Sequence, residues 1–243
     1  MADLHWLIAR PVAHRGLHDQ KSVIENTPSA FAAAIAARYG IECDLQISAD
    51  GEATVYHYDA LGRLTEGCSR LDATTAAELK RAAFKATGDR MITLGELCDL
   101  VAGRTTLLIE MKSRFAGDRR LVSRVATVLS GYHGPAAVMS FDPAQIADLR
   151  AIAAGLPRGM AMEKQGWDAF AAAPRRAMMT FAQALSARSQ FIAYAVRDLP
   201  ALLPAVARSV LRLPLLTWTV RSADDQRKAV RYADQMIFEG FRP

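Results

Sequence analysis

Residues 41–47, Ile41-Glu42-Cys43-Asp44-Leu45-Gln46-Ile47, form an apolar run with acidic residues at two alternate positions. The run predicts a strand, and alternate side chains of a strand lie on one face, so Glu42 and Asp44 point the same way. Two carboxylates on a buried face repel each other and cost several kcal/mol to desolvate without positive charge between them. Either a divalent cation binds there, magnesium or calcium suiting such hard ligands, or the strand is an edge strand with its acidic face in water.

Short apolar runs alternate with helix-like segments along the whole chain, which is typical of an α/β protein with a parallel sheet. Strands are expected over residues 11–14, 41–47, 53–57, 106–111, 136–141, 159–162, 191–195, 215–220 and 236–238. These nine candidates exceed by one the eight strands of an α/β barrel, for which a length of 243 residues is typical. We predict a single barrel domain over residues 1–243, with a helix-free connection at Asp50-Gly51 between the second and third strands.

Capping signals mark several helix starts. Helices are expected after Thr27-Pro28, over residues 29–39, at the capping boxes Thr75 with Glu78 and Thr93 with Glu96, over residues 118–129, and after Asp142-Pro143. These helices fall between expected strands, as a barrel requires.

The composition excludes several classes of protein. The net charge of +5 suits an anionic substrate, although it more commonly serves solubility, and no basic stripe interleaved with aromatic residues indicates nucleic-acid binding. Cys43, Cys68 and Cys98 are too far apart for a disulfide framework or a zinc site, which favours a reducing compartment. The chain shows neither a signal peptide nor an apolar stretch long enough to span a bilayer, so we expect a cytoplasmic protein without a transmembrane segment.

A second apolar strand also ends in charged residues. In Leu107-Leu108-Ile109-Glu110-Met111-Lys112, the side chains of Glu110 and Lys112 lie on one face. Charged residues at the C-terminal ends of barrel strands are usually catalytic. Glu110 could add a third carboxylate to a cation and Lys112 could neutralise a phosphoryl oxygen, or the two could form a structural ion pair.

Two histidines are expected at strand ends beside the carboxylate strand. His14 precedes Arg15-Gly16, and His57 closes residues 53–57. Phosphodiester cleavage needs a base for the attacking oxygen and an acid for the leaving alcohol, and two imidazoles meet both needs. Arg15 offers a bidentate fork for phosphate oxygens, and Gly16 permits a sharp turn. Of the other histidines, His18 lies close enough in sequence to compete for this role, whereas His5 and His133 lack such a context.

Together these segments resemble the glycerophosphodiester phosphodiesterase family. The resemblance rests on His14-Arg15-Gly16, Glu25-Asn26-Thr27 with Ala30-Phe31, Glu42, Asp44, Asp50-Gly51, His57, Leu61, Arg63, Thr65, Glu110 with Lys112, Ser140-Phe141 and Trp218-Thr219-Val220. These landmarks follow the family order from residue 12 to about residue 220, and the ordered set is far more specific than any one tripeptide.

The resemblance implies a TIM-type (β/α)8 barrel of the phospholipase-C-like phosphodiesterase type. It also implies hydrolysis of glycerophosphodiesters to glycerol 3-phosphate and an alcohol. The implied site has His14 and His57 as catalytic residues, Glu42, Asp44 and Glu110 as ligands of one divalent cation, Mg²⁺ or Ca²⁺, and Arg15 and Lys112 beside the phosphate. Glu25 and Asn26 are unexplained by helix capping and could face this site, and Trp218 could line the substrate pocket or belong to the core.

The sequence departs from the family pattern at two places. The family usually has aspartate directly after the second histidine, where this chain has Tyr58, with Asp59 one position later. The family also often ends in an Asp-Gly-Ile-Ile-Thr-Asp run, whereas this chain has Asp234-Gln235-Met236-Ile237-Phe238-Glu239. Two alternatives therefore stay open: a hydrolase of another phosphodiester such as a lysophospholipid, and a barrel that binds a phosphate ligand without turnover.

Overall fold

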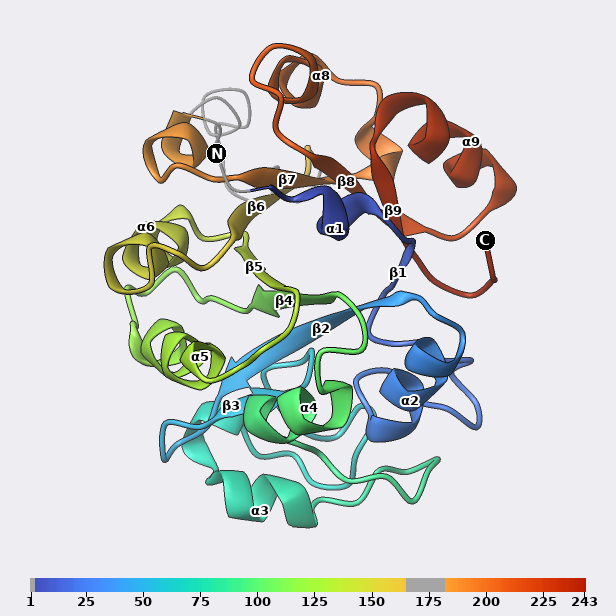
Figure 1. Ribbon diagram of the computed structural model, residues 1–243. Coiled ribbons are helices and arrows are strands. Elements are labelled where there is room, and N and C mark those ends of the chain that lie inside the picture. The colour runs from blue at the N-terminus through green and yellow to red at the C-terminus, as the bar shows by residue number, and fades with distance from the viewer. Residues whose placement is uncertain (1–2, 165–181) are drawn as a thin grey trace.

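A closed ring of strands forms the centre of the computed structural model, which describes residues 3–164 and 182–243 (Figure 1). The strands are β1 (Val12–Ala13), β2 (Gly40–Ile47), β3 (Ala53–Val55), β4 (Leu107–Met111), β5 (Ala136–Ser140), β6 (Arg158–Met162), β7 (Phe191–Ala195), β8 (Leu215–Val220) and β9 (Gln235–Phe238). Around the ring the order is β1, β2, β4, β5, β6, β7, β8, β9, and β9 pairs with β1 to close it. Every pairing within the ring is parallel, which confirms the predicted eight-stranded barrel.

The surplus strand is β3, which lies outside the ring. It pairs antiparallel with β2, with Leu45 opposite Val55, after a tight turn at Gly51. A connection this short can reverse the chain but cannot carry a parallel crossover. Of the nine expected strands, the one at residues 53–57 is therefore the one outside the barrel, and His57 follows its observed part, β3. The path from β2 to β4, the next strand of the ring, includes helices as well as β3.

Helices cover the outside of the ring (Figure 1). Their bounds are α1 (His5–Ile8), α2 (Pro28–Ala36), η1 (Leu71–Ala73), α3 (Ala76–Arg81), α4 (Leu94–Val101), α5 (Arg120–Ser130), α6 (Pro143–Ile152), η2 (Val196–Asp198), α8 (Leu202–Ser209) and α9 (Ala223–Tyr232). The expected caps of α2, α3, α4 and α6 are all formed by side-chain hydrogen bonds, including both capping boxes. No helix in the described part of the chain is both long and apolar enough to cross a membrane.

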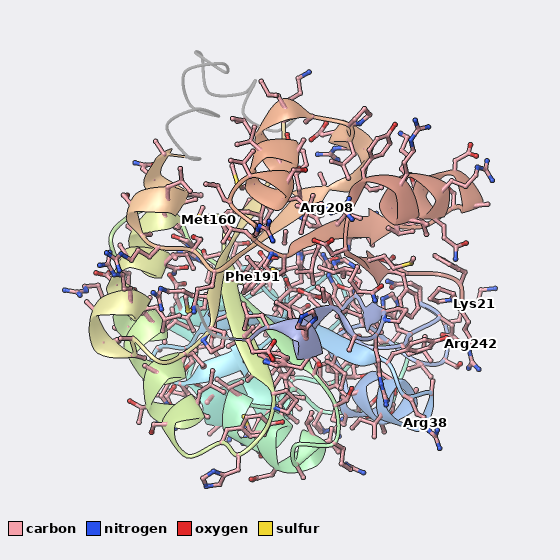
Figure 2. All side chains as sticks on the ribbon, turned by 45° about the horizontal axis from the view of Figure 1, so that its top comes forward. Lys21, Arg38, Met160, Phe191, Arg208 and Arg242 are labelled. Atoms are coloured by element: carbon pink, nitrogen blue, oxygen red, sulfur yellow. The ribbon has the colours of Figure 1, made fainter. Side chains whose placement is uncertain are left out.

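Strand alternation separates two environments. In β2, Ile41, Cys43 and Leu45 face the helices and belong to the larger apolar core, while Glu42 and Asp44 take the opposite face, inside the ring. A second apolar cluster fills the interior of the ring, and Phe191 belongs to it. Lys21, Arg38 and Arg242 are instead exposed at the periphery (Figure 2). The barrel interior is therefore apolar toward the N-terminal ends of its strands and ionisable toward their C-terminal ends.

Helix α1 closes the apolar end of the barrel. Leu4 and Leu7 pack into the interior cluster with Val12, Leu108 and Leu216, and α1 lies within the outline of the ring in Figure 1. The chain thus uses its first helix to exclude water from the end of the barrel opposite the charged residues.

Replacing Leu7 with alanine should lower the free energy of unfolding by about 3 kcal/mol, because it removes a fully buried side chain and leaves a cavity. Urea denaturation measures the change. Leu202→Ala is the matched control, since that leucine is 77% exposed and should cost less than about 1 kcal/mol. Similar losses in both variants would contradict the sealing role of α1.

Candidate active site

Three carboxylates meet inside the barrel at the C-terminal ends of β2 and β4. The parallel register places Asp44 beside Glu110, and Glu42 lies two residues earlier on the same face of β2. One oxygen of each carboxylate lies within 4.8 Å of the others, and all three side chains are buried. The predicted grouping of these residues is present in the structure.

Two basic side chains compensate part of this charge. The ammonium of Lys112 lies 2.8 Å from Oδ1 of Asp44 and 2.6 Å from Oε1 of Glu110. Nε of Arg15 lies 3.1 Å from Oδ2 of Asp44, and the amide of Asn26 donates a hydrogen bond of 2.9 Å to the same oxygen. Burial opposes ionisation of Asp44, but Lys112 and Arg15 outweigh it and hold the pKa of that carboxyl below its ordinary value.

Glu42 is the one carboxylate of the three whose side chain forms no close ion pair with Lys112 or Arg15. Its Oε2 accepts a hydrogen bond of 2.8 Å from the backbone N–H of Arg15, whereas its buried Oε1 has no hydrogen-bond partner among the described residues. Burial and the charges of Asp44 and Glu110 raise the pKa of Glu42 well above its ordinary value. An all-oxygen donor set with one unpaired buried oxygen fits a hard divalent cation, so the residues present are suited to hold one.

Arg15 reaches the carboxylates because the chain turns sharply after β1. Arg15 and Gly16 both adopt positive φ, at 56° and 81°. A Cβ on Gly16 would lie 2.8 Å from the Cβ of Ala30, so the expected need for glycine has a steric cause. The guanidinium also contacts Glu25 at 2.7 Å, which shows that both Glu25 and Asn26 face this site, as the sequence suggested.

His14 lies between two carboxylates. Its Nδ1 is 2.7 Å from Oε2 of Glu239, and its Nε2 is 4.0 Å from Oε2 of Glu42. Burial lowers the pKa of His14, and the hydrogen bond with Glu239 opposes that shift. The ring is therefore neutral near pH 7, with its two nitrogens in different environments.

His57 reaches the same site from β3. The backbone N–H of Tyr56 bonds to the carbonyl of Asp44, and the amide of Gln46 donates to the carbonyl of His57, so backbone contacts fix this segment beside β2. Burial lowers the pKa of His57 to about 4, and its buried Nδ1 has no hydrogen-bond partner in the part of the chain described. The ring packs against Tyr58, with centroids 4.7 Å apart.

A cavity of about 240 Å³ connects these groups. Both histidines, Arg15, Glu42, Glu110 and Lys112 line it, together with Met139, Phe141, Glu163, Trp218, Thr219, Arg221 and Ile237. Trp218 contacts Phe141 edge to face at 5.5 Å and donates its indole N–H to the carbonyl of Ala193. Trp218 thus lines the cavity, and the hydrogen bond from its indole nitrogen to Ala193 holds the side chain in place.

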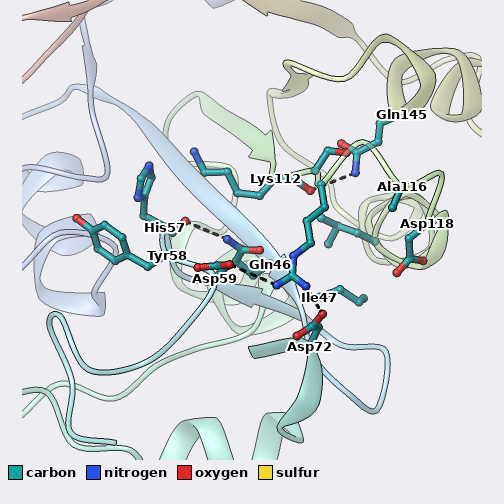
Figure 3. Close-up of a pocket in the computed structure, with 13 residues that line it drawn as sticks. Gln46, Ile47, His57, Tyr58, Asp59, Asp72, Lys112, Ala116, Asp118 and Gln145 are labelled. Carbon is teal, nitrogen blue, oxygen red and sulfur yellow. Dashed lines mark hydrogen bonds and ion pairs between the residues drawn. The ribbon is translucent and has the colours of Figure 1, made fainter. Parts of the chain in front are cut away.

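A larger cavity of about 540 Å³ adjoins the first, and both are lined by His57 and Lys112 (Figure 3). Its rim is charged: Arg114 forms ion pairs with Asp72 and, at 3.7 Å, with Asp59. The side chain of Asp59 is 61% exposed and also pairs with Arg70, at 3.6 Å.

Sequence reasoning did not assign a role to three residues of this site. Glu239 contacts His14, Arg221 contacts Glu239 at 2.8 Å, and Glu163 lines the smaller cavity. The alternation of inward- and outward-facing side chains along a strand could have identified Glu163 and Glu239. Each directly follows a strand, β6 or β9, at a position that faces the inside of the barrel. Of the remaining histidines, buried His18 lines a separate cavity behind Glu239, whereas His5 and His133 are exposed.

A closed parallel barrel with ionisable side chains gathered at the C-terminal ends of its strands is the arrangement found in (β/α)8-barrel enzymes. The chain belongs to the glycerophosphoryl diester phosphodiesterase family, whose family model matches residues 14–239.

Known proteins similar to this chain carry related names. A glycerophosphodiester phosphodiesterase of Caldanaerobacter subterraneus is 30% identical over 159 residues, which is 61% of this chain and 65% of that protein. The crystal structure of a Thermotoga maritima glycerophosphodiester phosphodiesterase is similar with a TM-score of 0.74, at 23% identity and 94% of each chain. An Oleispira antarctica phosphodiesterase in complex with the product sn-glycerol-3-phosphate matches with a TM-score of 0.76, at 18% identity, over 94% of this chain and 92% of that one. Both structures confirm the barrel fold.

Replacing Lys112 with methionine should lower the free energy of unfolding by about 3–5 kcal/mol, because Asp44 and Glu110 stay buried but lose the Lys112 ammonium that pairs with both. The measurement is made in EDTA so that no metal ion replaces this charge. Urea denaturation measures this loss. Lys80→Met removes an ammonium of the same kind from an exposed pair with Glu96 and should cost less than about 1 kcal/mol. Equal losses in the two variants would show that the buried cluster does not depend on Lys112.

Proposed function

We propose that this protein hydrolyses glycerophosphodiesters to glycerol 3-phosphate and an alcohol, with a divalent cation and with His14 and His57 as proton-transfer groups. The observation that carries the proposal is one cavity lined by both imidazoles, by the carboxylates of Glu42 and Glu110 and by the ammonium of Lys112. Family membership and the similarity to named phosphodiesterases support the same reaction.

Glu42, Asp44 and Glu110 would hold one divalent cation, either Mg²⁺ or Ca²⁺. When bound, such an ion supplies Lewis-acid polarisation of a phosphoryl oxygen. Arg15 and Lys112 place two further positive charges beside the same carboxylates. These charges attract a phosphodiester anion to this end of the cavity and offset the charge that develops on its oxygens.

Hydrolysis requires one proton to leave the attacking oxygen and one to reach the departing alcohol oxygen as the bond from phosphorus to that oxygen breaks. A neutral imidazole can accept the first proton, and a protonated imidazole can donate the second. Burial lowers the pKa of both histidines, so each is ready to accept a proton near pH 7. The negative charge of a bound phosphodiester favours protonation of the other ring.

The two adjoining cavities favour a small polar substrate over a lysophospholipid. Both ester arms of a phosphodiester start at phosphorus, and His57 and Lys112 line both cavities where they meet. The smaller cavity, at about 240 Å³, suits a group the size of glycerol. The larger one combines apolar side chains, such as Ile47 and Leu121, with the charged side chains of Asp59, Asp72 and Arg114. An acyl chain bound there would have to desolvate those charges.

Replacing His14 or His57 with alanine should lower the release of glycerol 3-phosphate from glycerophosphocholine by about 100-fold or more, because proton transfer loses its donor or acceptor. A coupled assay for glycerol 3-phosphate measures the rate. His133→Ala, in an exposed histidine, should leave the rate unchanged. Full activity in both site variants would refute the catalytic roles, and faster turnover of lysophosphatidylcholine by the native protein would refute the substrate assignment.

Adding Mg²⁺ or Ca²⁺ at about 100 times its Kd should raise the Tm of the EDTA-treated protein by about 5–10 °C, because the ion binds the folded state alone. Differential scanning fluorimetry measures the shift. Glu42→Gln should abolish most of it, whereas Glu66→Gln makes the same change at an exposed glutamate and should retain it. A protein that shows neither a Tm shift nor metal-stimulated hydrolysis would be the non-catalytic phosphate-binding barrel that Tyr58 leaves open.

A further inference from the structure

Glu239 makes a hydrogen bond to a candidate catalytic histidine that the proposed reaction does not itself require. Oε2 of Glu239 lies 2.7 Å from Nδ1 of His14, and both side chains are largely buried. A carboxylate accepts hydrogen bonds but cannot donate them, so Nδ1 carries the proton in this contact. The other ring nitrogen, Nε2, is then unprotonated in the neutral ring and lies 4.0 Å from Glu42.

The closure of the barrel places these two residues side by side. Strands β1 and β9 are parallel neighbours, with Val12 opposite Ile237 and Ala13 opposite Phe238, so His14 and Glu239 occupy the next position. The backbone N–H of His14 bonds to the carbonyl of Phe238, and the N–H of Glu239 bonds to the carbonyl of Val220. Backbone hydrogen bonds to both neighbouring strands therefore fix the point from which the Glu239 side chain extends.

Arg221 contacts the same carboxylate oxygen. Its Nη2 lies 2.8 Å from Oε2 of Glu239, while the Arg221 side chain is itself exposed. Burial opposes ionisation of Glu239, but the contacts with His14 and Arg221 outweigh it and keep its pKa below the ordinary value. The carboxylate is thus charged and held by two contacts to its Oε2, which restricts the orientation of the imidazole that it contacts.

We propose that Glu239 is a positioning residue for His14: its carboxylate keeps the ring in the form protonated on Nδ1 and directs an unprotonated Nε2 toward the cavity. The expected effect of Glu239 on kcat rests on the proposed function, whereas its effect on which nitrogen of His14 carries the proton does not. It makes the two histidines inequivalent, because Nδ1 of His57 has no such partner in the described residues. His14 is therefore the ring whose basic nitrogen is fixed before substrate binds.

Glu239→Met tests the proposal, since methionine is similar in size and shape but accepts no strong hydrogen bond. Long-range ¹H–¹⁵N NMR of the full chain in EDTA, at about pH 8 where the ring is neutral, reports which nitrogen of His14 carries the proton. We expect a proton on Nδ1 in the native protein and loss of that fixed form in the variant. With metal and glycerophosphocholine, kcat should fall on the order of 10- to 100-fold while KM changes little.

Glu239→Asp restores the charge on a shorter side chain and should recover part of the lost kcat. Asp234→Asn is the matched control: it removes an ion-paired carboxylate just before the other end of β9, where Asp234 contacts Arg208 at 2.8 Å, and kcat should not change. If the methionine variant does not fold, Glu239→Leu, which also lacks a hydrogen-bond acceptor, serves for the same measurements, with the same changes expected.

Three results would overturn the proposal: an unchanged Nδ1 proton on His14, a native kcat in the folded variant, or an aspartate variant as slow as the methionine variant. The NMR and kinetic measurements together distinguish a failure of this proposal from a failure of the proposed function. If the native protein releases no glycerol 3-phosphate, the proposed function fails, while the NMR measurement still decides whether Glu239 fixes the His14 ring.

Discussion

The unequal charge balance inside the barrel is the constraint on which the rest of the site depends. Glu42, Asp44 and Glu110 are buried together, and Lys112 and Arg15 supply two positive charges among them. Each cation needs its own structural support: Lys112 follows β4 directly, and Arg15 needs the left-handed turn that Gly16 permits. The register between β2 and β4 then sets the distances, so backbone pairing determines the electrostatics.

The barrel supplies the low-polarity surroundings that give these charges their effect. Apolar side chains fill the interior below the carboxylates, and α1 covers the far end, so water reaches the charged groups from one side only. Interactions between charges are stronger where water is excluded. The same burial lowers the pKa of both histidines, so the packing of the barrel also sets how readily these two rings bind a proton.

Local pattern in the sequence was sufficient for much of this structure. Alternation predicted that Glu42 and Asp44 share a face, capping signals located four helix starts, and the sequence order of motifs indicated the family. Two features required the folded chain. The orientation of β3 depends on a pairing that strand propensity does not encode, and the contact between His14 and Glu239 joins residues 225 positions apart through barrel closure.

The attachment of β3 outside the ring has a consequence for how this site can change over evolution. His57 and Tyr58 lie on the segment between β2 and α4, whose side chains Tyr56, Leu71 and Phe84 belong to a small apolar core separate from the two barrel clusters. Glu42, Asp44 and Glu110, the three clustered carboxylates, and His14 belong instead to the barrel framework. One half of the candidate proton-transfer pair and much of the rim are therefore carried by a separately packed module. Substitutions there would reshape the larger cavity while leaving the cluster of charged residues and the closure of the barrel intact.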